Sequence, residues 1–471
     1  MGAAAGNMVI VGTLSVRASA FRARVASAPA RFGPLELVVA LGAASAAVAG
    51  TIGADARWLP ALGRIILDRG KIPDGVPYAS APSPGWHNVP VLAELILRGL
   101  TSVAGDRGLL AAQVVAVGAA LGILAWDLRR AGADDLAGAL VLLVVVLGAL
   151  PVLLIVRSQL FSLLLFPVVV TLLRAEARSP SLRIWLITPL LALWSNLHGA
   201  VLVGLAVAAA YLIFGRARRQ PLLVGSVLAA SALAVCVTPS LQNTPGYYAG
   251  LLQNEAARRG EALWAPLSLT SGFDLLLLAA AIVLLVLAMR ARPALWEAIA
   301  LAGLAVLTVK TARSGVWLLF LAATPAARSL HLEPGRERRI AGIAVPVAIA
   351  LAIFGVVRGP LPSGAGDPLL DEALRRAAGT PILAESVPAE QVALAGGRVW
   401  MSNPLDAFSH AKQRLYLDWL AGRPAGDAAL QHAGRVVLVI RGNAPAKRLR
   451  SAPAFREIAH DAHVILYVRR R

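Results

Sequence analysis

The chain has 471 residues, of which 58% are hydrophobic and 15% are charged. Soluble domains are about 45–50% apolar and about 25% charged, and disordered chains are less hydrophobic still, so this composition excludes both classes. The remaining class is a polytopic membrane protein, whose units are apolar segments of roughly 20 residues. The formal net charge of +19 then has two readings, nucleic-acid binding or membrane topology, and the positions of the basic residues decide between them.

Eleven apolar segments predict about eleven membrane spans. The first runs from Leu35 to Ile52, and a long polar loop at residues 54–106 follows it. The other ten segments lie at residues 107–126, 137–156, 159–173, 184–197, 200–215, 221–238, 273–289, 294–309, 314–327 and 340–357. Several are shorter than a straight crossing needs. The short runs around residues 157 and 198 are also compatible with broken helices, so the span count is open by about one pair.

The arginines gather in alternate turns between these segments. The arginines of the turns that we assign to the inside are Arg129, Arg130, Arg174, Arg178, Arg183, Arg216, Arg218, Arg219, Arg290, Arg292, Arg328, Arg336, Arg338 and Arg339, together with Arg17, Arg22, Arg24 and Arg31 before the first span. The positive-inside rule then predicts a cytoplasmic N-terminus and an extracytoplasmic C-terminal region. It also accounts for the net charge, so we expect no nucleic-acid partner.

The composition changes after Arg358, where a linker rich in Pro and Gly begins. Two parts are expected, a membrane part at residues 1–358 and a soluble extracytoplasmic α/β domain at residues 359–471. Strands are predicted at residues 381–385, 398–402, 435–441 and 463–469, and helices at residues 367–378, 388–395, 407–420 and 454–460. Their alternation favours a parallel or mixed sheet. A Gly-rich phosphate loop is absent from the sequence, so no nucleotide site is expected.

The first outer loop begins with Asp55, directly after the first span. A carboxylate there is placed to act as a general base on an acceptor hydroxyl, or it is an interfacial charge that anchors the helix end. The next residues predict an amphipathic helix that lies in the membrane plane. Its apolar face carries Leu59, Leu62, Ile65 and Ile66, and its polar face carries Arg64, Asp68 and Arg69.

Two further residues of this loop are candidates for substrate binding, His87 and Glu94. Glu94 opens a second amphipathic helix, where Arg98 at i+4 is its plausible ion-pair partner. His87 is otherwise an ordinary loop histidine. Asp55, His87 and Glu94 are chemically able to hold a metal, but their spacing does not require one. We therefore assign no metal ligand and no cofactor, and a divalent metal is left open without support.

The remaining candidates lie at the outer ends of later spans. Arg157 and Gln159 stand between two apolar runs, where an arginine is either a phosphate ligand or a side chain that snorkels to the interface. The string Trp194-Ser195-Asn196-Leu197-His198-Gly199 places Asn196 and His198 in an apolar stretch, either as part of a site or as a tight turn. Lys310 and Arg313 add positive charge at another outer end.

Together these features resemble the GT-C superfamily of membrane glycosyltransferases. The resemblance rests on an acid directly after the first span, a long first outer loop, many spans and an outer C-terminal domain. The matching strings are Asp55…Trp58…Gly63…Ile66…Gly70-Lys71-Ile72-Pro73, Arg157-Ser158-Gln159, Trp194 to Gly199 and Val399-Trp400-Met401-Ser402-Asn403-Pro404-Leu405-Asp406-Ala407-Phe408. They are similar to motifs of a bacterial group within that superfamily.

The resemblance implies an inverting glycosyltransferase of the bacterial plasma membrane. Its donor would be a polyprenyl-phosphate-linked hexose or pentose, and its acceptor a cell-envelope glycan, glycolipid or protein on the outer face. By analogy Asp55 would be the base, and Arg157 or Arg313 would hold the donor phosphate. One alternative is a non-catalytic envelope assembly protein on the same scaffold, which binds a glycan or partner through its C-terminal domain. A lipid or solute transporter is less favoured, because the sequence has no internal repeat and few ionisable residues at midplane.

Overall fold

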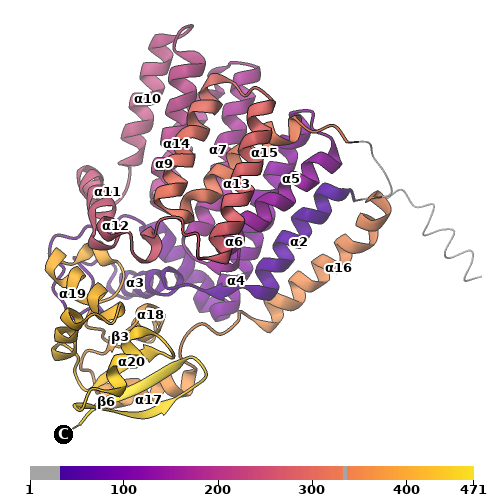
Figure 1. Cartoon of the computed structure of the whole chain (residues 1–471). Helices are drawn as coiled ribbons and strands as arrows, with labels where there is room; N and C mark the ends of the chain where they lie inside the picture. The colour runs from indigo at the N-terminus through magenta and orange to yellow at the C-terminus, as the bar shows by residue number, and fades with distance from the viewer. Residues whose placement is uncertain (1–31, 333–336, 471) are drawn as a thin grey trace, which may run out of the picture.

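The computed structural model describes residues 32–332 and 337–470, without the side chains of residues 337–339. The arginines at positions 17, 22, 24, 31 and 336, and the side chains of Arg338 and Arg339, lie outside this described part. The described chain forms a bundle of helices with a small α/β layer at one end (Figure 1).

Each of the eleven predicted apolar segments is helical over most of its length. The bundle elements are α2 (Pro34–Ala49), α4 (Val91–Arg130), α5 (Asp135–Gly148), α6 (Leu150–Leu154), α7 (Gln159–Arg178), η1 (Leu182–Leu186), α8 (Ile187–Ser195), α9 (Val201–Ala210), η2 (Tyr211–Arg216), α10 (Pro221–Val235), α13 (Gly272–Arg290), α14 (Leu295–Lys310), η5 (Ala312–Ser314), α15 (Gly315–Arg328) and α16 (Glu337–Arg358). Within the described ranges, four helices are long and apolar enough to cross a membrane: Val91–Arg130, Gln159–Arg178, Gly272–Arg290 and Ile340–Arg358.

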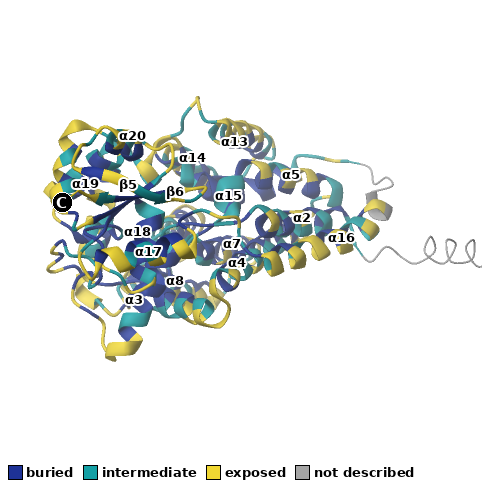
Figure 2. Ribbon diagram, turned by 90° about the horizontal axis from the view of Figure 1, so that it is seen from below, coloured by how far each residue is buried: buried dark blue, intermediate teal, exposed yellow. Residues whose placement is uncertain are grey.

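The outer surface of the bundle is apolar. On α13, Ile282 is 53% exposed and Val286 is 55% exposed, and on α16, Ile353 and Phe354 are exposed by 61% and 60%. Figure 2 shows exposed residues along the rim of both helices. Side chains of this kind would be unfavourable in water at such density, and lipid tails are the environment that they match.

A break at Gly105 divides α4 into a shorter N-terminal part and a longer apolar part. Gly105 has φ 56° and ψ −141° inside an otherwise helical run. Residues with a Cβ rarely adopt positive φ, so glycine is suited to this break. The break coincides with the predicted end of the first outer loop at residue 106.

The amphipathic helix of the first loop is α3 (Asp55–Arg69), and it is covered by protein on both sides. It packs against α4 and against α18 (Ser386–Leu394) of the C-terminal region. Leu59 and Leu62 are buried in the same core as that region. On the polar face, the Arg64 guanidinium donates to the carbonyl oxygen of Leu394 at 2.9 Å. The helix therefore buries its apolar face in protein rather than in lipid, and its orientation in the membrane plane stays a prediction.

Two very short strands tie the C-terminal ends of α2 and α6 together. β1 (Thr51–Ile52) pairs in parallel with β2 (Ile155–Val156). Thr51 also forms a bridge with Leu361, which follows α16. Three chain segments that are distant in sequence thus meet at one point, directly before Asp55 and Arg157.

The C-terminal region forms a four-stranded mixed sheet with helices. Its elements are α17 (Asp367–Ala377), β3 (Leu383–Ala384), α18, η6 (Leu405–Ala407), α19 (His410–Leu420), η7 (Pro424–Gln431), β4 (Val436–Ile440), α20 (Ala444–Arg450), β5 (Phe455–His460) and β6 (Val464–Arg469). The strand order is β3-β4-β6-β5, with β3 parallel to β4 and the other pairs antiparallel. This confirms the expected small α/β fold.

Two of the predicted elements there are wrong. Residues 454–460 were expected to be helical but form β5, which pairs with β6 through a short connection. Pairing with a neighbouring strand overrides the local helix preference of this segment. The strand expected at residues 398–402 is reduced to isolated bridges of Val399 with Ile382 and Ala79.

The first loop and the C-terminal region share one hydrophobic core and are joined by backbone hydrogen bonds. The amide of Val399 donates to the carbonyl oxygen of Tyr78 at 3.0 Å, and the amides of Ser80 and Ala81 donate back to Val399 and Trp400 at 2.8 and 2.9 Å. We call this contact the clasp. Tyr78 and Trp400 are both buried in the shared core.

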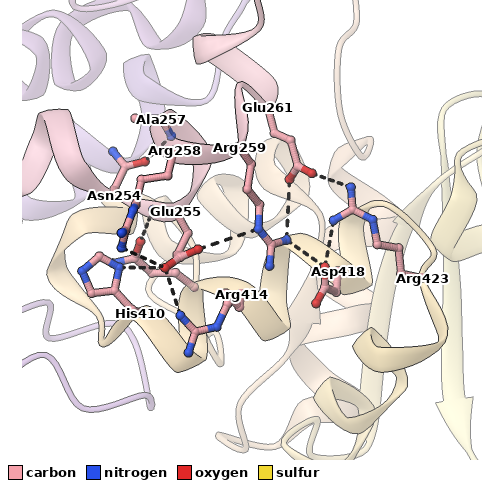
Figure 3. A network of polar contacts seen from close by, with 11 residues as sticks. Asn254, Glu255, Ala257, Arg258, Arg259, Glu261, His410, Arg414, Asp418 and Arg423 are labelled. Carbon is pink, nitrogen blue, oxygen red and sulfur yellow. Dashed lines mark hydrogen bonds and ion pairs between the residues drawn. The ribbon is translucent and has the colours of Figure 1, made fainter.

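The segment between α10 and α13 contains α11 (Thr244–Gln253), α12 (Glu255–Arg259) and η4 (Ala262–Trp264), which we call the arm. An ion-pair network joins α12 to α19 (Figure 3). The Glu255 carboxylate accepts from Arg414 Nη1 and contacts His410 Nδ1, each at 3.0 Å. Arg259 Nη1 donates to Asp418 Oδ1 at 2.8 Å. The arm is therefore fixed to the C-terminal region.

Several arginines assigned to inner turns are buried in ion pairs at the opposite end of the bundle. Arg174 donates to Asp127 Oδ2 at 2.6 Å, to Glu297 Oε1 at 2.9 Å and to Thr324 Oγ1 at 2.8 Å. Arg216 pairs with Glu176 at 2.8 Å. These arginines hold helix ends together, a role that their sequence positions did not reveal.

Candidate functional site

Asp55 is the first residue of α3, and it is half-buried beyond the C-terminal end of α2. Its Oδ1 accepts a long hydrogen bond of 3.4 Å from the indole nitrogen of Trp58. Just before it, the Gly53 amide donates to the carbonyl oxygen of Val156 at 2.9 Å. A Cβ on Gly53 would lie 3.0 Å from Cγ of Arg157. The β1–β2 pair therefore brings the chain that carries Asp55 against the chain that carries Arg157.

Arg313 joins this pair from the turn between α14 and α15. Its guanidinium lies over the ring of Trp264 in the arm, 4.4 Å from the ring centroid. Burial lowers the pKa of Arg313 to about 10, while the negative charge of Asp55 opposes this shift and the positive charge of Arg157 adds to it. One carboxylate and two guanidiniums thus act on one another, and a site with this charge pattern suits an anionic group.

His198 lies in the turn between α8 and α9. Its Nδ1 lies 2.8 Å from Oγ of Ser162 and accepts from the Ala200 amide at 3.2 Å. Ser162 in turn accepts from the indole nitrogen of Trp194 at 2.7 Å, so the serine hydroxyl is free to donate to His198. Burial lowers the pKa of His198 to about 3, and the charge of Arg313 adds to this effect. The imidazole is therefore neutral, with its proton on Nε2 as a hydrogen-bond donor.

Asn196 and Glu94 occupy structural positions around this turn. Asn196 Nδ2 donates to the carbonyl oxygens of Ala192 and Val237 at 2.8 and 2.7 Å. Glu94 is 0% exposed, and its Oε2 accepts from Asn88 Nδ2 at 2.8 Å. Among the described ion pairs, none joins Glu94 to Arg98, so the expected i+4 pair is replaced by the bond to Asn88.

Tyr247 on α11 was not singled out from the sequence. It is half-buried. Burial raises its pKa well above 10, and the charges of Asp406, Glu94 and Asp55 raise it further. Tyr247 is therefore within electrostatic reach of acidic groups from the first loop and the C-terminal region. The only signal in the sequence was the Tyr247-Tyr248 pair in an outer loop that also contains acids.

The C-terminal region also contributes two carboxyl groups to this area, Glu390 and Asp406. Glu390 Oε1 accepts from the backbone and side-chain nitrogens of Asn403 at 3.2 and 3.1 Å. Burial raises the pKa of Glu390 well above its usual range, and the charge of Asp55 contributes. Asp406 accepts from Trp86 Nε1 at 2.9 Å. The string from Val399 to Phe408 therefore packs onto the first loop close to Asp55.

The other predicted site residues lie further out. His87 is exposed beside a surface pocket, Lys310 is exposed at the end of α14, and Gln159 is half-buried at the first turn of α7. Within the described chain, no group of three His, Cys, Asp or Glu side chains is arranged to hold a metal ion. Asp55, His87 and Glu94 thus do not form the metal site that their residue types left open.

The bundle, its apolar surface and the α/β layer define a helical polytopic membrane protein with a GT-C-like fold. Comparison with protein-family models finds no match, and neither does comparison with curated proteins. Among solved structures, the chain is similar to the crystal structure of ArnT from Cupriavidus metallidurans bound to undecaprenyl phosphate. The TM-score is 0.52 with 12% sequence identity, and the match covers 92% of this chain and 96% of that one. At this identity the similarity establishes the fold alone, and it confirms the fold that the motifs predicted.

Proposed function

We propose that this protein is a membrane glycosyltransferase that moves a sugar from a polyprenyl-phosphate-linked donor to an acceptor hydroxyl. The observation that carries the proposal is the meeting of Asp55, Arg157 and Arg313 at one end of a GT-C-like fold. The solved structure with this fold was bound to undecaprenyl phosphate. A lipid phosphate is the anionic group that a pair of guanidiniums at the edge of a bilayer would match.

The proposed orientation places this end of the bundle outside a bacterial plasma membrane. Arg129, Arg174 and Arg216 occupy the other end, which the positive-inside rule assigns to the cytoplasm. Residues 359–471 would then form an extracytoplasmic domain on a membrane part made by residues 1–358. The acceptor would be a glycan, glycolipid or protein of the cell envelope.

The proposed chemistry is a single displacement with inversion. Asp55 takes the proton of the acceptor hydroxyl while its oxygen attacks the anomeric carbon of the sugar. The bond between that carbon and the phosphate oxygen breaks, and the electron pair leaves with the polyprenyl phosphate. Arg157 and Arg313 stabilise the charge that develops on the leaving phosphate. His198, neutral and with a proton on Nε2, donates a hydrogen bond within the same site.

The test is to replace Asp55 and measure release of the lipid phosphate. The full chain in proteoliposomes is supplied with a panel of undecaprenyl-phosphate-linked hexoses and pentoses and with membrane extract as the acceptor source. Free undecaprenyl phosphate is quantified by mass spectrometry. Asp55→Asn is expected to slow release by about 10²–10⁴-fold, the usual contribution of a general base.

Asp68→Asn is the matched control, because Asp68 is an exposed acid on the same helix. It should leave the rate unchanged. Binding of undecaprenyl phosphate to Asp55→Asn should persist, because the proposed phosphate ligands are intact. A wild-type rate in Asp55→Asn removes Asp55 from the mechanism, and no release with any donor in the wild type refutes the proposed activity.

A further inference from the structure

The guanidinium of Arg313 is half-buried and has no acidic partner. Within residues 32–332 and 337–470 it donates no hydrogen bond to a protein atom and forms no ion pair. The contact that the structure does show for it is the ring of Trp264, whose centroid lies 4.4 Å from the guanidinium carbon. A partly buried cation needs a source of negative potential, and the face of an indole supplies one.

This contact differs in chemistry from an ion pair. A carboxylate in the place of Trp264 would take N–H donors of the guanidinium in a bidentate pair and would compete with a phosphate for them. An indole attracts the cation through its ring quadrupole and contributes no competing acceptor oxygen. Trp264 can therefore hold Arg313 while the N–H donors of the guanidinium stay available to an anionic ligand.

Backbone hydrogen bonds tie the segment that follows Trp264 to the turn between α14 and α15. The amide of Leu267 donates to the carbonyl oxygen of Val309 at 3.2 Å, near the end of α14. The amide of Ala312 in η5 donates to the carbonyl oxygen of Ala265, also at 3.2 Å. These two bonds hold the chain that carries the indole beside the chain that carries the guanidinium.

The other side of η4 is held by the C-terminal region. The amide of Trp264 donates to the carbonyl oxygen of Glu261 at 3.0 Å, and the Glu261 carboxylate accepts from Arg423 (Figure 3). Arg423 follows α19 and also pairs with Asp418 at 2.8 Å. Each link from Arg423 through the arm to Arg313 is therefore a direct contact.

We propose that Trp264 is a positioning residue for Arg313, and that the Glu261–Arg423 pair makes this positioning depend on the C-terminal region. The inference rests on the proposed function, in which Arg313 binds the phosphate of the lipid donor. An arginine side chain has several rotatable bonds, so fixing its position in advance reduces the ordering that ligand binding must impose. The arm and the C-terminal region then take part in donor binding.

The experiment measures the Kd of undecaprenyl phosphate for the full chain in nanodiscs by native mass spectrometry. Trp264→Leu removes the aromatic face and keeps an apolar side chain, whereas Trp264→Phe keeps an aromatic face. Trp126→Leu is the matched control, because Arg130 lies over the ring of Trp126 at 4.3 Å, in the same kind of contact near the C-terminal end of α4. The unfolding temperature of each variant is recorded alongside.

Trp264→Leu is expected to weaken binding by about 5- to 30-fold, the range of a partly desolvated cation–π contact. Trp264→Phe should recover most of the affinity, and Trp126→Leu should bind as the wild type does. Glu261→Gln should weaken binding in the same direction as Trp264→Leu. In an Arg313→Ala background, where Arg157 remains, Trp264→Leu should weaken binding no further, because its effect acts through Arg313.

Four results would overturn the inference and leave the proposed function standing. They are wild-type binding in Trp264→Leu, equal losses in Trp264→Leu and Trp264→Phe, an equal loss in Trp126→Leu, and a loss of the same size in the Arg313→Ala background. The last result would show that Trp264 acts on the fold or on the lipid without Arg313. Absence of undecaprenyl phosphate binding in the wild type would count against the proposed function, and the inference would fall with it.

Discussion

The spacing between Gly53 and Arg157 yields a sharp prediction for a single added methyl group. In Gly53→Ala the new Cβ would lie 3.0 Å from Arg157 Cγ, 3.0 Å from Ile155 Cγ2 and 3.0 Å from the carbonyl oxygen of Val156. Carbon atoms in contact prefer about 3.5–4.0 Å, so the neighbouring atoms must give way by a few tenths of an ångström. The carbonyl belongs to β2 and moves little, which leaves the Arg157 side chain to move most.

The expected effect on phosphate binding follows from the hydrogen bonds that the Arg157 guanidinium is proposed to donate to the lipid phosphate. A hydrogen bond to a charged group contributes about 1.5–3 kcal/mol, so losing one through misplacement weakens affinity by about 10- to 100-fold. Overpacking of this size lowers the free energy of unfolding by about 1–3 kcal/mol. The Kd must therefore be measured on protein that is verified as folded.

The assay is titration of undecaprenyl phosphate into the full chain in nanodiscs, followed by native mass spectrometry. Arg157→Ala sets the limit for complete loss of the side chain. Gly99→Ala is the control, because Gly99 lies in α4 and an added Cβ would meet nothing within 4 Å. It should bind as the wild type does.

Two results would refute this reasoning. If Gly53→Ala binds like the wild type while Arg157→Ala does not, the β1–β2 spacing does not set the position of the guanidinium. If Arg157→Ala also binds like the wild type, Arg157 is no ligand of the lipid phosphate.

Two further predictions concern stability. Arg174→Met leaves Asp127, which is 0% exposed, without its ion-pair partner, and should lower the free energy of unfolding in detergent by about 3–5 kcal/mol. The control Arg178→Met replaces an exposed arginine and should change the free energy of unfolding little. Equal effects of the two substitutions would contradict a role for the buried pair. Burial raises the pKa of Glu385 to about 7 from 4.5, so its stabilising contribution is complete below about pH 4.5 and is lost as the pH rises through 7, by at most ~3 kcal/mol. The unfolding temperature of the wild type should therefore fall from pH 5 to pH 8, and Glu385→Gln should reduce that fall. Parallel curves of unfolding temperature against pH for the two proteins would contradict the assignment.

The sequence predicted the membrane helices and the fold because their signal is local. Runs of apolar residues and alternating arginine turns can be read within windows of about 20 residues. The α/β region was predicted less well, since a segment such as residues 454–460 becomes a strand only when β6 is beside it.

The candidate site shows the same division between local and distant information. Asp55, Arg157 and Arg313 were identifiable because charged residues at the ends of apolar segments are unusual. Tyr247 and Glu390 were not, because their relation to Asp55 depends on contacts between segments far apart in the chain. The ion pairs of the arm with α19 are equally nonlocal.

The clasp has a consequence for how the protein is made. Beside the clasp, the Tyr78 hydroxyl donates to the backbone carbonyl oxygen of Asn403, a bond between residues 325 positions apart. Synthesis at about 5–20 residues per second separates the appearance of these two residues by roughly 16 to 65 seconds. During that interval α3 has no α18 to cover it. Its amphipathic pattern fits temporary residence on the bilayer surface. The membrane would then cover the apolar face of α3 until the last quarter of the chain has been synthesised.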